Sequence, residues 1–335
     1  MNTLTNRRKN LTPWLLMAPG LLFSCYVALR RAGMAVLYKA VAFEEEQVRR
    51  DICYREGSGD EKHRLDIYLP AGADFPVLIF IHGGGLASGD KGLRVSGADV
   101  YGNIGRFYAS QGIGVAVINY RLQPKATWRE QVEDVAHATS WVYSNLATYG
   151  ADRSQLFIGG HSAGAHLATR VALDHKPLSE LGLSPDILSG VIAVSGAGYD
   201  LADEKTYELG AKRLHYESRF RCGDCTDGWK REASPISHVQ PTAPPFLIIY
   251  AEGEYKSLQR QSQLLHEALQ QNQVPSQLVV VPGQSHCRIV LTLSRPDRTS
   301  APAILQFIAS NRLVESGLFS KSDFTSLADT EAQLS

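Results

Sequence analysis

The sequence has no net charge: its 335 residues include 34 lysines and arginines and 34 aspartates and glutamates. Without a net field to draw the chain toward a polyanion, no nucleic-acid partner is expected. Internal repeats and a central linker rich in Pro, Gly or Ser are also absent, which excludes a repeat array and favours one main domain. The apolar fraction of 44% is enough for a large buried core.

Cysteine is scarce as well. Five cysteines are too few for a disulfide scaffold. Cys222 and Cys225 have the spacing of a metal or redox pair, but no second pair or histidine couple completes the roughly four ligands that zinc needs. No metal site is therefore expected, and we interpret the pair as a local disulfide that pins a loop. Such a bond suits an oxidising compartment.

Charge is missing from residues 11–29, a stretch that lies between basic residues on both sides. The stretch is long enough to cross a bilayer as a helix, but Pro13, Pro19 and Gly20 weaken such a helix and fit an export signal as well. The alternatives are a helix that covers the site of a soluble protein and a bacterial lipoprotein cleavage site. We expect residues 1–45 to form a signal or membrane anchor with a connecting helix, which predicts a membrane-anchored or exported protein on the periplasmic or extracellular side.

From about residue 50, apolar runs of strand length alternate with helical patterns. This alternation predicts a mainly parallel, doubly wound α/β sheet within residues 46–315, with ligands at the carboxyl ends of the strands. Residues 316–335 become polar and aperiodic, and we expect a flexible tail there. The first expected strand, RLDIYLP, alternates as a half-buried strand does. The others resemble strands covered on both faces: PVLIFIH, GIGVAVINY, QLFIGG, SGVIAVSG, PPFLIIYAE and SQLVVVPG.

One serine stands at such a strand end between two glycines, in Gly160-His161-Ser162-Ala163-Gly164. An apolar strand precedes it and the helical pattern AHLATRVAL follows it, which is the context of a nucleophile elbow. The turn is so tight that a Cβ two residues before or after the serine would collide with a neighbouring strand or helix. Glycine is therefore required at both positions, and we expect Ser162 to be a nucleophile.

A serine hydroxyl hardly ionises at neutral pH, so it needs a base, and the base needs a third group to hold it. His286 follows the last apolar strand in a loop of small residues and is the expected base. Most other histidines fall within helices or away from strand ends, and His161 points elsewhere by the geometry of the turn. For the acid, Glu254 is favoured over Glu252 because the residue further from the strand can reach the imidazole. Asp200 stays open as a third candidate.

A glycine-rich loop follows the strand PVLIFI directly, in His82-Gly83-Gly84-Gly85. Glycines let backbone N–H groups turn inward with no side chain in the way. We expect Gly84 and Gly85, with the N–H of Ala163, to form an oxyanion hole, and we expect His82 to order the loop. The loop lacks the Lys-Ser/Thr pair of a P-loop and the G-x-G-x-x-G pattern, which argues against nucleotide binding.

Several segments together resemble the α/β-hydrolase superfamily over roughly residues 60–312: HGGG, VINYRL, VEDVAHATSWVYSNLATYGAD, GGHSAGAHLA, ASPISHV and GQSH. The chain looks like the branch that holds carboxylesterases, hormone-sensitive-lipase-like esterases, kynurenine formamidases and prenylcysteine methylesterases. The resemblance implies an α/β-hydrolase fold with a lid inserted at about residues 201–233. The lid aromatics would then either contact an apolar substrate group or pack within the lid itself.

The same resemblance implies a serine hydrolase that cleaves a small-molecule carboxylic ester through an acyl-enzyme, with no metal or organic cofactor. The alternatives are an arylformamidase-type amide hydrolase and a catalytically inactive binding protein of the same fold. Relatives usually carry aspartate where Glu254 stands, so its loop must retreat by about one methylene. His161 and the SAGAHLA segment look closer to formamidases and methylesterases, whereas the third glycine after His82 departs from the formamidase pattern.

Overall fold

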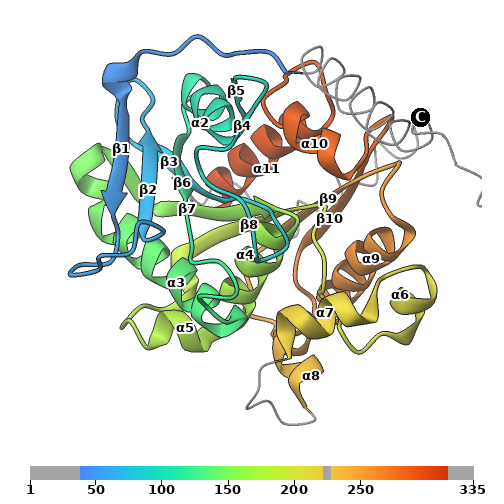
Figure 1. The fold of residues 1–335 in the computed structure, drawn as a ribbon. Coiled ribbons are helices and arrows are strands. Elements are labelled where there is room, and N and C mark those ends of the chain that lie inside the picture. The colour runs from blue at the N-terminus through green and yellow to red at the C-terminus, as the bar shows by residue number, and fades with distance from the viewer. Residues whose placement is uncertain (1–37, 222–227, 316–335) are drawn as a thin grey trace, which may run out of the picture.

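Eight strands form the central sheet of the computed structural model, which describes residues 38–221 and 228–315 (Figure 1). Their order is β1-β2-β6-β3-β7-β8-β9-β10, and only β2 runs against the others. The predicted mainly parallel sheet is therefore confirmed. The strands are β1 (Val48–Cys53), β2 (Arg64–Tyr68), β3 (Phe75–Ile81), β6 (Gly114–Ile118), β7 (Ala151–His161), β8 (Leu188–Val194), β9 (Phe246–Ala251) and β10 (Ser276–Val281). A separate pair comprises β4 (Arg94–Val95) and β5 (Ala98–Asp99).

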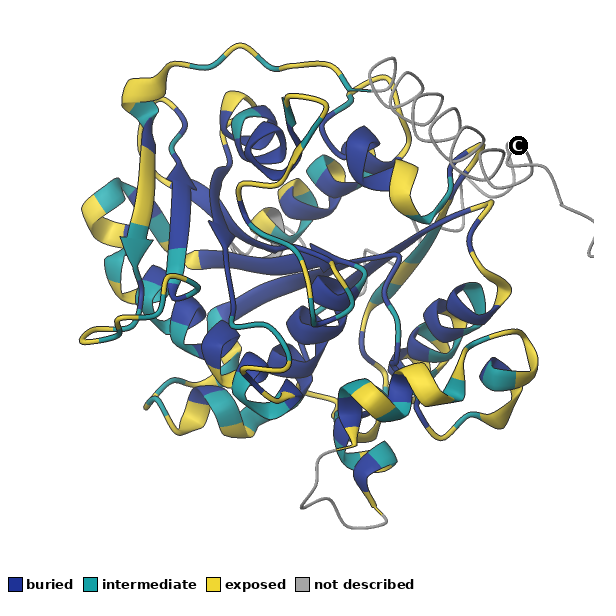
Figure 2. Ribbon diagram, viewed as in Figure 1, coloured by how far each residue is buried: buried dark blue, intermediate teal, exposed yellow. Residues whose placement is uncertain are grey.

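All seven apolar runs form strands, but burial differs from the expectation at both sides of the sheet (Figure 2). β2 was expected to be half-buried, yet four of its five residues are buried because β1 pairs beyond it. The prediction that β10 is covered on both faces is wrong. Within the described residues β10 pairs only with β9, so it is an edge strand whose Gln277 and Val280 are exposed.

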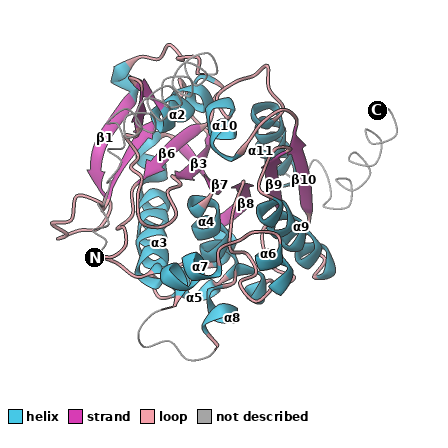
Figure 3. Ribbon diagram, turned by 45° about the vertical axis from the view of Figure 1, so that its right-hand side comes forward, coloured by secondary structure: helices cyan, strands magenta, loops and turns pink. Residues whose placement is uncertain are grey.

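Helices cover both faces of the sheet, and each layer has its own apolar core (Figures 1 and 3). One layer contains α3 (Trp128–Asn145), α4 (Ala163–Leu173) and α9 (Lys256–Gln271), and the other contains α2 (Val100–Ser110), α10 (His286–Thr292) and α11 (Ser300–Glu315). α3 begins at a capping box, in which Thr127 and Glu130 satisfy each other's backbone N–H groups. Shorter helices are η2 (Glu45–Gln47), η3 (Leu146–Tyr149), α5 (His175–Ser179), η4 (Pro185–Ile187) and η5 (Pro235–His238).

In the expected lid region, the described residues 201–221 and 228–233 hold three short helices, α6 (Glu204–Glu208), α7 (Arg213–Phe220) and α8 (Trp229–Ala233), on the side of the sheet that carries α4 and α9 (Figure 3). Its aromatic side chains pack inward. The rings of Tyr216 and Phe220 stack at 6.3 Å, and Phe220 also contacts Trp128 of α3. Tyr216, Phe220 and Trp229 are all buried. Of the two alternatives for these aromatics, packing within the lid and against the body is the one observed.

Within residues 38–221 and 228–315, no helix combines the length and apolar character needed to span a bilayer. The uncharged stretch 11–29 lies outside the described residues, as do Cys222, Cys225 and the expected tail at 316–335. The anchor or signal, the local disulfide and the flexible tail therefore stay predictions.

Candidate active site

The carboxyl ends of three strands bring the predicted nucleophile, base and acid together. Ser162 follows β7, Glu254 lies in the turn after β9, and His286 follows the loop after β10. His286 Nε2 lies 3.0 Å from Ser162 Oγ, and His286 Nδ1 lies 3.1 Å from Glu254 Oε2. With the ring proton on Nδ1, the imidazole donates to the carboxylate and Nε2 accepts from the serine hydroxyl. The arrangement can therefore take a proton from Ser162.

The backbone at Ser162 has φ 56° and ψ −118°, a conformation that non-glycine residues rarely adopt. Its N–H donates to the carbonyl of Val194 at 2.9 Å, which ties the turn to β8. A Cβ at Gly160 would lie 2.6 Å from the carbonyl oxygen of Ile81, and one at Gly164 would lie 2.1 Å from the same atom. The steric reason predicted for both glycines is confirmed.

Glu254 and Glu252 have different roles in the loops after β9 and β10. The side chain of Glu254 is fully buried and faces His286. Glu252 instead accepts a hydrogen bond from the N–H of Gly283 at 2.9 Å. The backbone between the two glutamates is held as well, because Gly253 N–H donates to the carbonyl of Gln284 at 2.9 Å. Glu252 therefore joins the two loops, and Glu254 is the carboxylate that meets the imidazole.

Two further predicted features differ in detail. His286 was expected within a loop, but it is the first residue of α10 and the helix fixes its backbone. Asp200, the third candidate acid, bonds elsewhere: its N–H donates to Gln261 Oε1, and its carboxylate accepts from the N–H of Ala202. Asp200 has no contact with His286 among the described residues.

The glycine-rich loop packs against the nucleophile, since a Cβ at Gly83 would lie 3.2 Å from Ser162 Cβ. The N–H of Gly83 donates to the hydroxyl oxygen of Tyr101 at 3.1 Å, and burial raises the pKa of Tyr101 to about 12. Within the described residues, no acceptor takes the N–H groups of Gly84, Gly85 or Ala163. These three donors remain available to a ligand.

Contacts from outside the loop fix its shape. The carbonyl of Leu86, a residue with φ 65°, accepts from Gln131 Nε2 at 2.7 Å and from the N–H of Gln123 at 2.9 Å. The ring of His82 stacks on Tyr120 at 4.5 Å. Burial lowers the pKa of His82 to about 4, so the ring is uncharged at neutral pH. Its contacts agree with the prediction that His82 orders the loop, whereas Gln131 had no signal in the sequence beyond its place on a helix.

Comparison with known proteins shows the family of this chain. The family model BD-FAE matches residues 65–269, more than half of the chain. The chain belongs to the BD-FAE family. The match contains Ser162 and Glu254, while His286 lies beyond its end.

This BD-FAE chain is 30% identical to a probable isoprenylcysteine alpha-carbonyl methylesterase of Oryza sativa subsp. japonica, across 80% of the chain and 63% of that protein. It is 35% identical to Esterase LipQ of Mycobacterium tuberculosis, across 65% of the chain and 52% of that protein. The chain thus spans less than two thirds of the length of these relatives.

Two solved structures share the fold. Esterase B from Lactobacillus rhamnosis superimposes with a TM-score of 0.68 at 22% identity, covering 90% of this chain and 96% of that one. The hyperthermophilic esterase from Pyrobaculum calidifontis gives a TM-score of 0.65 at 21% identity, covering 91% and 99%. The α/β-hydrolase fold implied by the resemblance is confirmed.

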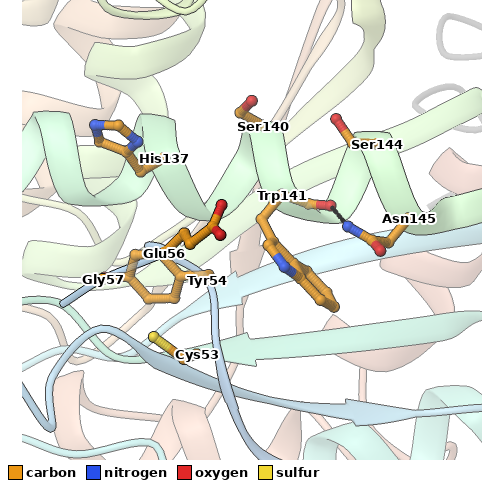
Figure 4. A pocket seen from close by; sticks show the side chains of 9 residues that line it. All are labelled: Cys53, Tyr54, Glu56, Gly57, His137, Ser140, Trp141, Ser144 and Asn145. Atoms are coloured by element: carbon orange, nitrogen blue, oxygen red, sulfur yellow. Dashed lines mark hydrogen bonds between the residues drawn. The ribbon is translucent and has the colours of Figure 1, made fainter. Parts of the chain in front are cut away.

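A cavity of about 590 Å³ lies apart from the candidate active site, between α3 and the segment that follows β1 (Figure 4). None of the candidate nucleophile, base, acid or oxyanion residues lines it. No group of His, Cys, Asp and Glu side chains in the described ranges is arranged to hold a metal ion. The lining residues are Cys53, Tyr54, Glu56, Gly57, His137, Ser140, Trp141, Ser144 and Asn145.

Proposed function

We propose that this BD-FAE protein is a serine hydrolase that cleaves a small-molecule carboxylic ester through an acyl-enzyme. The observation that carries the proposal is the chain of contacts from Ser162 to His286 to Glu254, at 3.0 and 3.1 Å, beside the glycine-rich loop. Ester substrates are supported by the relatives, which include a probable methylesterase and an esterase.

The geometry supports a two-stage reaction. His286 Nε2 takes the proton of Ser162 as Oγ attacks the ester carbonyl, and Glu254 stabilises the imidazolium that forms. The C–O bond to the alcohol then breaks, and His286 returns the proton to the departing oxygen. In the second stage His286 deprotonates a water molecule, which attacks the acyl carbon. The bond from that carbon to Ser162 Oγ then breaks, His286 returns the proton to Oγ, and the acid is released.

The developing oxyanion needs fixed donors, and the N–H groups of Gly84, Gly85 and Ala163 are the proposed set. This proposal is supported by their hydrogen bonding: within the described residues these three N–H groups have no acceptor. The N–H of the neighbouring Gly83, in contrast, donates to the hydroxyl oxygen of Tyr101. Losing one such donor costs about 3 kcal/mol of transition-state stabilisation in enzymes of this kind.

A fluorophosphonate probe and a series of p-nitrophenyl esters of graded acyl length test the proposal. We expect the wild type to be labelled and to hydrolyse short esters, and Ser162→Ala to do neither. Ser140→Ala, a serine of α3 at the separate cavity, serves as the control and should match the wild type. Labelling that persists in Ser162→Ala, or a folded wild type without activity or labelling, would contradict the proposal and favour a binding protein. A faster rate on N-formylkynurenine than on the esters would favour the arylformamidase alternative.

We further propose that residues 11–29 anchor the protein to a membrane or direct its export. The support is the length of this uncharged stretch and the basic residues on either side. Cell fractionation with mass measurement tests it: a retained anchor gives the full mass in the membrane fraction, and a cleaved signal gives a shorter exported chain. A full-length chain in the cytosolic fraction would contradict both.

A further inference from the structure

We infer that His161 is a positioning residue that holds His286 in register with Ser162. The inference rests on the proposed function. His161 is the last residue of β7 and the covalent neighbour of Ser162. Its Nε2–H donates to the backbone carbonyl of His286, at 2.9 Å. One hydrogen bond thus links the backbone of the base directly to the residue beside the nucleophile, across 125 positions of sequence.

This link completes the support of His286. The imidazole has to keep two contacts at once, to Ser162 Oγ and to the carboxylate of Glu254. On the loop side, the backbone is held by the bond from Gly253 N–H to the carbonyl of Gln284. On the helix side, His161 holds the carbonyl of His286 itself. A small shift of this backbone would lengthen both imidazole contacts, so fixing it favours the productive geometry.

The ring of His161 packs close to both the base and the glycine-rich loop. It lies 4.9 Å from the ring of His286 at an angle of 40°. A Cβ added at Gly83 would lie 3.0 Å from its Nδ1, so the glycine-rich loop is also close to the ring. The packing on these neighbours and the bond to the carbonyl of His286 together define the orientation of the ring.

The ring is also suited to stay neutral beside a base that becomes charged. Only 6% of His161 is exposed, and burial together with the charge of His286 lowers its pKa to about 3. A neutral ring donates a hydrogen bond from its Nε2–H without repelling the imidazolium that forms at His286. A carboxylate at this position would have no proton to donate and would face the carbonyl oxygen with like polarity.

Three substitutions test the role, each measured with a p-nitrophenyl ester and by the rate of fluorophosphonate labelling. His161→Gln keeps an N–H donor and should stay within a few-fold of the wild type. His161→Phe keeps the bulk without the donor, and should lower kcat and the labelling rate roughly 3- to 10-fold with KM unchanged, as expected for one lost hydrogen bond. His161→Asp should lower them further. The control is His175→Gln in α5, which should match the wild type.

The outcomes separate this inference from the proposed function. If His161→Phe melts below the wild type, His161→Asn repeats the comparison, because its amide is too short to reach His286. The inference would be overturned if the Phe, Asn and Asp variants had the same kcat and labelling rate as the wild type. Labelling of Ser162 would still support the hydrolase in that case. A wild type that neither reacts with the probe nor cleaves esters would instead overturn the proposed function.

Discussion

Shortening Glu254 to aspartate tests which of two neighbouring glutamates is the acid. Both carboxylate oxygens of Glu254 lie 3.1 Å from His286 Nδ1. Removing one methylene withdraws the carboxylate by roughly 1.5 Å, which takes it beyond hydrogen-bonding range. The backbone cannot follow easily, because the N–H groups of Gly253 and Glu254 are held by the carbonyls of Gln284 and Ala251 at 2.9 and 3.0 Å.

The expected loss follows from the bond that is removed. A hydrogen bond to a charged group contributes about 1.5 to 3 kcal/mol, which corresponds to a decrease in kcat of roughly 10- to 150-fold for Glu254→Asp. Glu254→Gln keeps the length but removes the charge that stabilises the imidazolium. In the serine-protease template, the matching amide substitution lowers kcat about 10⁴-fold, so the Gln variant should be the slower of the two.

The assay is kcat for a short p-nitrophenyl ester at pH 7 to 8, with the same two substitutions at Glu252 as matched controls. Glu252 bonds to the N–H of Gly283, so its variants should stay within a few-fold of the wild type. If the Glu252 variants lose more activity than the Glu254 variants, the acid has been assigned to the wrong residue. Equal melting temperatures across the set would show that stability is not the cause.

Three further predictions concern stability. Gly164→Ala places a Cβ 2.1 Å from the carbonyl oxygen of Ile81, so overpacking should cost about 1 to 3 kcal/mol and lower Tm; an unchanged Tm would refute the steric account. Asp134→Asn removes the buried carboxylate that pairs with Arg121 and Arg55, and losing these charge-assisted hydrogen bonds should cost about 1.5 to 3 kcal/mol in denaturant unfolding. The adjacent exposed control Glu133→Gln should cost within about 0.5 kcal/mol, and equal losses for the two would refute the prediction. Burial lowers the pKa of three histidines to about 4 or below, far under the ordinary 6.5, so the unfolded chain binds protons there that the folded chain does not. Their stabilising effect is complete above pH 6.5 and is lost as pH falls through 6.5 toward the folded values of about 4 and 3, by up to about 1.4 kcal/mol per pH unit for each group; a flat Tm from pH 8 to 5 would contradict it. These histidines are His82, His161 and His166, with pKa values of about 4, 3 and 3.

The sheet could be predicted from the sequence where strand composition alone is informative. Apolar runs such as PVLIFIH become fully buried strands. β1 was missed because three of its six residues are charged. An edge strand with solvent-exposed residues tolerates such charges. The edge position of β10 could not be predicted, because three consecutive valines look the same at an edge and in the centre. Which strands pair beside them depends on the topology of the whole sheet.

The candidate site divides in the same way between local and distant contacts. The glycines around Ser162 are imposed by one tight turn, so a short motif was enough to predict them. Tyr101, Gln131 and the donor role of His161 were not found, because each depends on a contact between segments that are remote in sequence. No local pattern distinguishes these side chains from ordinary core residues.

Three of the seven non-glycine residues with positive φ in the described ranges follow strands at the edge of the sheet where the proposed chemistry takes place. Ser162, Leu86 and Ser195 have φ values of 56°, 65° and 45°, and none is glycine. Such residues each cost about 1 to 3 kcal/mol and persist only where the surroundings fix them. Here the surroundings are backbone bonds from neighbouring strands: Ser162 N–H donates to Val194, and Ser195 N–H donates to Ile249 at 2.7 Å. The packed sheet thus offsets the strain that aims the nucleophile, which explains why the site stands on strand ends and why its precision depends on residues that never touch a substrate.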